Sequence, residues 1–208
     1  MISPAYIGTQ FRAVLTMAAG HPLWRQYLDT GTDGFYRSFA ALVLSVPLAI
    51  AFELMARRLF AYLPEMSAAA DTGLPAIYLA VLQMAVTAAS WIAFVFALIV
   101  VARRMGQERR ISALVVGYNW AELLVAIIQT ATMFLILISP DPAVFYAVII
   151  GPLIFKLYLM WGVFRRALDL NAIQTIGLIV MAFFITLLVN LVISAAGYAV
   201  FSVFAGPA

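Results

Sequence analysis

A lysine and a glutamate lie deep inside long apolar stretches, where charged side chains are rare. Lys156 is the only lysine of the chain. It lies about eight residues from one end of its stretch, or roughly 12 Å at 1.5 Å per helical residue. Glu122 lies about eleven residues from the corresponding end of the preceding stretch. If the two stretches are neighbouring antiparallel helices, these similar depths predict an ion pair, because charges in a membrane face a partner or a hydrated cavity.

Further polar residues share the helical face of Glu122. Asn119, Glu122, Ala126 and Gln129 follow one another at offsets of three, four and three, which places them on one side of a helix. We take Asn119, Glu122, Gln129 and Lys156 as a candidate intramembrane polar site. Such a stripe can line a pathway for an ion, a proton or a headgroup, or it can hydrogen-bond one helix to another. The structural role is the commoner one, and Lys156 can also extend its ammonium to the membrane surface.

The sequence lacks the residues that most enzymes and metal sites need. It has no cysteines, which excludes disulfides and thiolate chemistry, and His21 is its only histidine. We expect His21 in a loop, because Pro22 follows it and a metal site requires several convergent ligands. A Ser-His-Asp set, a phosphate-binding glycine loop and an HExxH zinc motif are all missing. We therefore expect no enzymatic activity, no metal and no cofactor.

Apolar stretches of membrane-spanning length make up most of the chain. Of 208 residues, 66% are hydrophobic and only 10% are charged, whereas soluble domains carry about 25% charged residues. Each stretch is close to or longer than the ~20 residues that a helix needs to cross the hydrocarbon core. The sequence therefore predicts an all-α polytopic membrane protein with five transmembrane helices. Their expected ranges are 38–56, 75–102, 111–138, 143–164 and 172–204.

The segment before the first span contains a predicted amphipathic helix. Ser3 and Pro4 are typical of a helix start, and apolar residues follow at helical spacing from Ile7 to Ala18. This helix could lie in the membrane interface or pack on the ends of the spans, and both placements fit the pattern. We expect residues 1–37 to form a cytoplasmic N-terminal segment and residues 38–208 to form one transmembrane domain.

The arginines are distributed unevenly between the two ends of the predicted bundle. Nine of them lie in the N-terminal segment and in the loops after the second and fourth spans, against Arg57 and Arg58 on the other side. The positive-inside rule then predicts a cytoplasmic N-terminus and a periplasmic C-terminus. A composition rich in alanine and arginine indicates a bacterial inner (cytoplasmic) membrane as the location. We expect anionic lipid headgroups, and not nucleic acid, as the partners of these arginines.

The fourth and fifth spans resemble a known family. The run from Leu157 to Gln174, with Trp161 followed by a short basic turn, resembles the corresponding stretch of Yip-type (Ypt/Rab-interacting protein) membrane domains. Tyr118 and Asn119 fit the same resemblance. It implies a non-enzymatic domain of five spans with a cytoplasmic N-terminus, from a bacterial branch of that family. Neither functional residues nor the vesicle-traffic role of the eukaryotic relatives is carried over, because bacteria lack that machinery.

Three functions are compatible with these observations. The one that the sequence favours is a non-enzymatic inner-membrane protein that organises the membrane or serves as an accessory subunit, in a homo-oligomer or a larger membrane complex. A first alternative is a small transporter or channel component that uses the polar stripe around Glu122 and Lys156. A second alternative is a lipid-binding or lipid-scrambling protein. That alternative would gain support if the basic turns and the N-terminal helix formed one headgroup-sized pocket.

Overall fold

A computed structural model describes residues 2–61, 76–138 and 142–205 of the chain. Within these ranges, five helical segments are long and apolar enough to cross a membrane, which confirms the predicted all-α, five-helix fold class. The helices, in chain order, are α1 (Pro4–Ala19), α2 (Trp24–Tyr27), α3 (Thr32–Ser38), α4 (Ala40–Ala61), α6 (Ala76–Arg104), the 3-10 helix η1 (Glu108–Arg110), α7 (Ile111–Ile138), α8 (Pro142–Ala167) and α9 (Ala172–Ala205).

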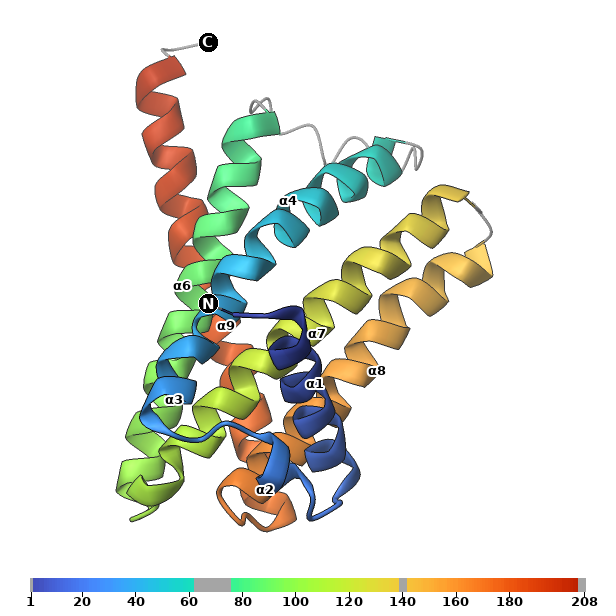
Figure 1. Cartoon of the computed structure of the whole chain (residues 1–208). Coiled ribbons are helices and arrows are strands. Elements are labelled where there is room, and N and C mark those ends of the chain that lie inside the picture. Colours follow the sequence, from blue (N-terminus) through green and yellow to red (C-terminus); the bar gives the residue numbers. More distant parts are fainter. Residues whose placement is uncertain (1, 62–75, 139–141, 206–208) are drawn as a thin grey trace.

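The long helices are arranged as two antiparallel pairs, and α4 contacts both of them (Figure 1). One pair is α7 with α8, and the other is α6 with α9. The pairs lie close together at one end of the bundle and diverge toward the end where the C-terminus lies (Figure 1). We call the closed end the basic end, because the turns there carry a set of arginines. These are Arg103, Arg104, Arg109, Arg110, Arg165 and Arg166.

The core is packed most tightly in the half of the bundle next to the basic end. Phe94 of α6, Tyr118 of α7 and Phe164 of α8 form an aromatic cluster with ring centroids 5.0, 5.8 and 6.2 Å apart. On another side of α7, Trp120 is fully buried and meets the rings of Tyr6 and Phe11 edge-on. Aromatic packing of this kind fills the space between the helices, so the bundle is closed at this end.

The outward faces of the long helices expose large apolar side chains. Phe96 of α6 and Phe183 of α9 are 68% and 66% exposed. In water such a surface would be strongly unfavourable, whereas in a bilayer it meets acyl chains. The chain is thus a polytopic membrane protein whose helices contact lipid.

The first span begins earlier than residue 38. Helix α3 starts at Thr32, and Phe39 keeps a right-handed helical conformation between α3 and α4. The Ser38 hydroxyl donates to the carbonyl of Phe35 at 2.7 Å, so this polar residue is satisfied inside the helix and does not end it. The expected boundary between residues 37 and 38 therefore lies within helical structure that begins at Thr32.

Two of the predicted helix starts have the expected caps. The Ser3 hydroxyl accepts the amide of Tyr6 at 3.2 Å at the start of α1. At the start of α9, the amide of Gln174 donates to the Asn171 side chain at 2.9 Å and the amide of Asn171 donates to the Gln174 side chain at 3.1 Å. The first matches the helix start predicted at Ser3, and the second is a capping box. Residue 75, where the second span is predicted to begin, lies outside the described residues.

Helix α1 packs against the halves of α7 and α8 that lie next to the basic end (Figure 1). Its inward face, with Val14, Met17 and Ala18, is buried. Gly162 of α8 has no side chain, which lets the backbone of α1 approach at Ala18. The guanidinium of Arg166 then donates to the Ala18 carbonyl at 3.1 Å. Of the two placements that the sequence allowed, the structure thus shows the helix packed on the spans.

Candidate functional site

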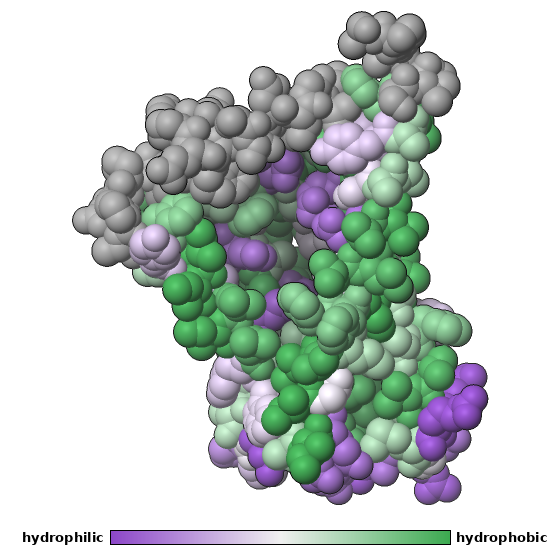
Figure 2. All heavy atoms as spheres, turned by 180° about the vertical axis from the view of Figure 1, so that it is seen from behind, coloured by the Kyte–Doolittle hydropathy of each residue, from purple (hydrophilic) through white to green (hydrophobic). Residues whose placement is uncertain are grey.

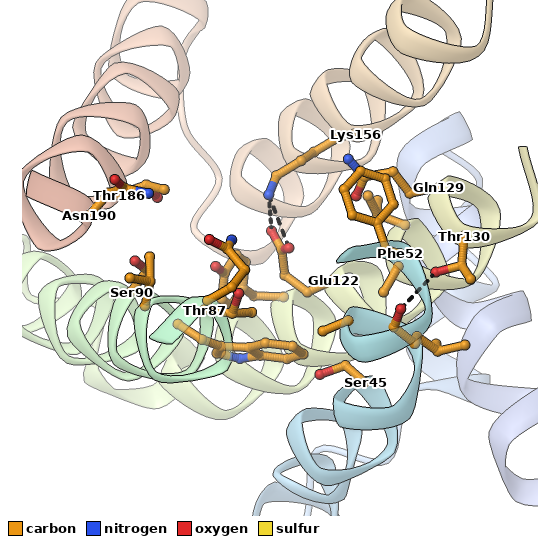
Figure 3. Close-up of a pocket in the computed structure, with 18 residues that line it drawn as sticks. Ser45, Phe52, Thr87, Ser90, Glu122, Gln129, Thr130, Lys156, Thr186 and Asn190 are labelled. Carbon is orange, nitrogen blue, oxygen red and sulfur yellow. Dashed lines mark hydrogen bonds and ion pairs between the residues drawn. The ribbon is translucent and has the colours of Figure 1, made fainter. Parts of the chain in front are cut away.

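Lys156 and Glu122 form an ion pair between α8 and α7. The Nζ atom of Lys156 lies 3.0 Å from Oε2 and 3.0 Å from Oε1 of Glu122. The Glu122 side chain is 14% exposed and that of Lys156 is 39% exposed. The pair is therefore partly open to its surroundings, and it is not sealed into the core. Figure 3 shows both side chains pointing toward the same open space.

That space is a cavity of about 330 Å³, to which all five long helices contribute. Leu48 and Phe52 of α4 and Val86 and Trp91 of α6 supply apolar parts of its wall. Many other lining side chains are polar (Figure 3). The polar lining residues are Ser45, Gln83, Thr87, Ser90, Tyr118, Glu122, Gln129, Thr130, Lys156, Thr186 and Asn190.

Four of the polar lining residues are exposed, although they lie within the apolar spans. They are Gln83, Gln129, Thr186 and Asn190. Seen from the side opposite to Figure 1, hydrophilic residues lie in a hollow of the surface between predominantly apolar walls (Figure 2). Exposed amides and hydroxyls are costly in contact with acyl chains. These side chains are therefore expected to contact water or a polar ligand and not acyl chains.

Ser90 adds a donor without a protein partner. Its hydroxyl oxygen is buried, lines the cavity, and makes no hydrogen bond to the described residues. Thr130, in contrast, donates to the backbone carbonyl of Leu48 at 3.3 Å and joins α7 to α4. Buried polar groups are normally paired. Ser90 is thus a buried hydroxyl at the cavity wall whose hydrogen-bonding capacity the described residues do not use.

The structure brings together three of the four residues predicted from the sequence. Glu122, Gln129 and Lys156 line the cavity, whereas Asn119 is fully buried and is not among the lining residues. Asn119 accepts from the indole Nε1 of Trp91 at 2.8 Å, and its amide nitrogen donates to the Ser38 hydroxyl at 2.9 Å. It therefore holds α3, α6 and α7 together.

Several lining residues have no distinguishing signal in the sequence. Ser45, Ser90, Thr130 and Thr186 are single hydroxyl residues in long apolar helices. Serine and threonine are common in membrane helices, where they satisfy themselves on the backbone or on neighbouring helices. Their convergence on one cavity becomes visible only when the helices are packed together.

The cavity has a polar lining without net charge among the described residues. Its only lining charges among the described residues are the carboxylate of Glu122 and the ammonium of Lys156, which compensate each other. Within residues 2–61, 76–138 and 142–205, no group of three or more His, Asp or Glu is placed to hold a metal. A paired cation and anion beside amides and hydroxyls can receive a neutral or zwitterionic polar group.

Comparison of the chain with models of known protein families, with curated proteins and with solved structures finds no match. The resemblance to Yip-type domains receives no support from these comparisons and stays a prediction.

Proposed function

We propose that the protein is a small transporter or channel component that takes a neutral or zwitterionic polar solute into the cavity between α4 and α6–α9. The observation that carries this proposal is the convergence of exposed polar side chains from α6, α7 and α9 at positions within the apolar spans. A bundle without a polar ligand would fill these positions with apolar residues, because a polar group in hydrocarbon costs free energy.

The ion pair fits this role because it is accessible. Lys156 is 39% exposed and lines the cavity, so its ammonium can contact a ligand there. A zwitterion can insert its cationic group next to Glu122 and its anionic group next to Lys156, and so exchange one set of charge contacts for another. A ligand with a net charge would leave either Glu122 or Lys156 without an opposite charge beside it.

The accessory-subunit hypothesis remains a second candidate for one specific reason. The hollow between the helix pairs opens on the surface (Figure 2), and a partner helix with polar residues could cover it. In that case the polar lining would hydrogen-bond a second chain or a second copy of this one. The two hypotheses differ in whether the isolated protein lets a solute cross the membrane.

Solute permeation of proteoliposomes tests the proposed function. Vesicles with and without the protein are mixed with hyperosmotic glycerol, urea or glycine, and re-swelling is followed by light scattering. We expect at least one of these solutes to enter faster with the protein, and Gln129→Leu to slow that entry. Phe183→Leu on the outward face of α9 is the matched control and should leave it unchanged. Equal rates with and without protein for all three solutes would contradict the proposal.

We further propose that the protein lies in a bacterial inner membrane with its basic end in the cytoplasm. The support is the bias of nine arginines against two between the two sides. Because the chain has no cysteine, a single Gln107→Cys variant reports the location of the loop between α6 and η1. An impermeant thiol reagent should label this variant only after the cells are opened. Labelling in intact spheroplasts would place residue 107 on the periplasmic side and contradict the proposed orientation.

A further inference from the structure

A second concave site lies at the basic end and differs in kind from the cavity between the helix pairs. Its volume is about 330 Å³, and four of its lining side chains are arginines. Arg25 comes from α2, Arg109 and Arg110 from η1, and Arg166 from the last turn of α8. Among the described residues that line it, none is acidic. Three segments that are distant in the sequence thus direct positive charge into one pocket, which we call the arginine pocket.

Like charges gathered in this way repel one another and need a counterion. Of the two acids near these arginines, Asp169 makes the contact, since its Oδ2 lies 3.6 Å from an amino nitrogen of Arg110. Glu108 precedes Arg109 in η1 and lies outside the pocket lining. Asp169 is itself 82% exposed and lines a neighbouring pocket. A single exposed carboxylate offsets one arginine at most. The arginine pocket therefore retains a strong positive potential that favours an anion.

The position of Arg166 is fixed by the end of α1. Its guanidinium donates to the Ala18 carbonyl at 3.1 Å. Gly20 caps α1 at a φ of 83°, and a side chain there would collide with the guanidinium. Only one of the Arg166 nitrogens is used in this bond, so others remain available. This arginine is held in place before any ligand arrives, which lowers the cost of binding.

The start of α7 adds to the same potential. Ser112 and Ala113, in the first turn of α7, also line the arginine pocket. The Ser112 hydroxyl donates to the carbonyl of Thr30 at 2.6 Å and ties the N-terminal segment to α7. A helix N-terminus carries a partial positive charge. Here the start of α7 adds to the positive potential of the four arginines, which form the main part of the site.

We propose that the arginine pocket binds a phosphate group, carried by an anionic lipid headgroup or by a soluble phosphorylated molecule. The planar forks of arginine match phosphate oxygens in two-point contacts. The volume accommodates one such group together with part of the molecule that bears it. This site is separate from the solute cavity, and its occupancy would connect the N-terminal segment, η1 and α8 through one ligand.

Thermal unfolding of the full-length protein in a neutral detergent tests this site. The unfolding midpoint is followed during titration with short-chain phosphatidylglycerol, with short-chain phosphatidylcholine and with inorganic phosphate. We expect phosphatidylglycerol or phosphate to raise the midpoint and phosphatidylcholine to have much less effect. A response to phosphatidylglycerol without one to inorganic phosphate identifies a lipid headgroup, and the reverse identifies a soluble source. A response to both supports a pocket that recognises the phosphate group from either source.

A pair of double variants separates the arginine pocket from general surface charge. Arg25→Gln with Arg109→Gln removes two pocket arginines whose side chains are exposed. We expect the half-saturating ligand concentration to rise by roughly tenfold or more for each arginine removed. Arg103→Gln with Arg104→Gln makes the same charge change at the same end, outside the pocket lining, and should leave the titration nearly unchanged.

Two results would overturn the proposal. One is that phosphatidylglycerol and phosphate raise the unfolding midpoint of the wild-type protein no more than phosphatidylcholine does. The other is that both double variants weaken the response equally, which would assign it to diffuse surface charge. If the Arg25 and Arg109 double variant does not purify as a folded protein, the single Arg109→Gln replaces it, because η1 contributes no buried side chain.

Discussion

The ammonium nitrogen of Lys156 lies 3.0 Å from each carboxylate oxygen of Glu122. This contact joins α8 to α7 at the wall of a polar cavity. It neutralises the only lining charges of that cavity within the described residues. The pair therefore links two helices and leaves the cavity lining without net charge among the described residues.

The ion pair should contribute measurably to stability. We expect a coupling free energy of about 1–3 kcal/mol, between the values for exposed and for fully buried pairs. A double-mutant cycle with Glu122→Gln, Lys156→Met and the combined variant measures it by unfolding in mixed detergent and dodecyl sulfate. The double variant should be more stable than the Lys156→Met single variant, which leaves a carboxylate without its partner. A coupling energy of zero would show that the two side chains do not interact.

Asn119 should behave as a structural residue and Gln129 as a cavity residue. Asn119→Ala leaves the buried Trp91 indole without its acceptor and removes one of the two hydrogen bonds of the buried Ser38 hydroxyl. We expect a loss of about 2 kcal/mol or more, because unpaired buried groups cost about 1–3 kcal/mol each. Gln129→Ala on the same helix should change the unfolding free energy by about 0.5 kcal/mol or less. Similar losses at the two positions would contradict this division of roles.

The close approach of α1 and α8 depends on Gly162. A methyl group there would collide with the backbone of Ala18. We expect Gly162→Ala to destabilise the protein by about 1–3 kcal/mol, as overpacking does. Limited proteolysis should then cut the N-terminal segment faster. Gly177→Ala on α9 is the control, since nothing lies within 4 Å of the added carbon. Unchanged proteolysis of Gly162→Ala would mean that α1 is not held at this point.

Alkaline pH should weaken the docking of the N-terminal segment. Burial, and then the hydrogen bond to Asp29, raises the pKa of Tyr6 from its ordinary value of 10.0 to about 12. Between these values the unfolded chain has released a proton that the folded chain keeps. The Tyr6 contribution is thus complete below about pH 10 and is lost as the pH rises toward about 12. The unfolding midpoint of Tyr6→Phe should fall less over this interval than that of the wild type, and equal losses would contradict the assignment.

The spans and the ion pair were accessible to prediction for simple physical reasons. A helix must keep about 20 apolar residues in the hydrocarbon core. The five spans can therefore be located from the long apolar runs of the sequence. The pair could be predicted because the rise per residue places Glu122 and Lys156 at similar depths in consecutive antiparallel helices. Both predictions need only the depth of a residue in the membrane, which can be counted along the sequence.

The surroundings of the pair were not accessible in the same way. Asn119 and Glu122 are three residues apart, which is about 60° around the helix axis. That angle is enough to direct Asn119 toward Trp91 and Ser38 while Glu122 faces the cavity. Thr186 of α9 shares the cavity, but α9 is apolar around most of its circumference. Its rotation therefore depends on packing, which periodicity does not reveal.

The placement of α1 was open for a related reason. The sequence shows an apolar face but not which surface covers it. The structure covers that face with α7 and α8 through the absence of a side chain at Gly162 and the bond from Arg166 to the Ala18 carbonyl. Both features are single residues in another helix, and neither has a pattern that points to α1.

Single introduced cysteines test directly whether water enters the cavity, because the native chain contains no cysteine. Gln129→Cys and Thr186→Cys place a thiol in the cavity, while Phe134→Cys and Phe183→Cys on the same helices place one on the outward surface. Thiols react with maleimides as hydrated thiolates. In folded, reconstituted protein, a water-soluble maleimide should label residues 129 and 186 and leave 134 and 183 largely unlabelled. Equal labelling at all four positions, or protection of both cavity positions, would contradict a water-filled polar cavity.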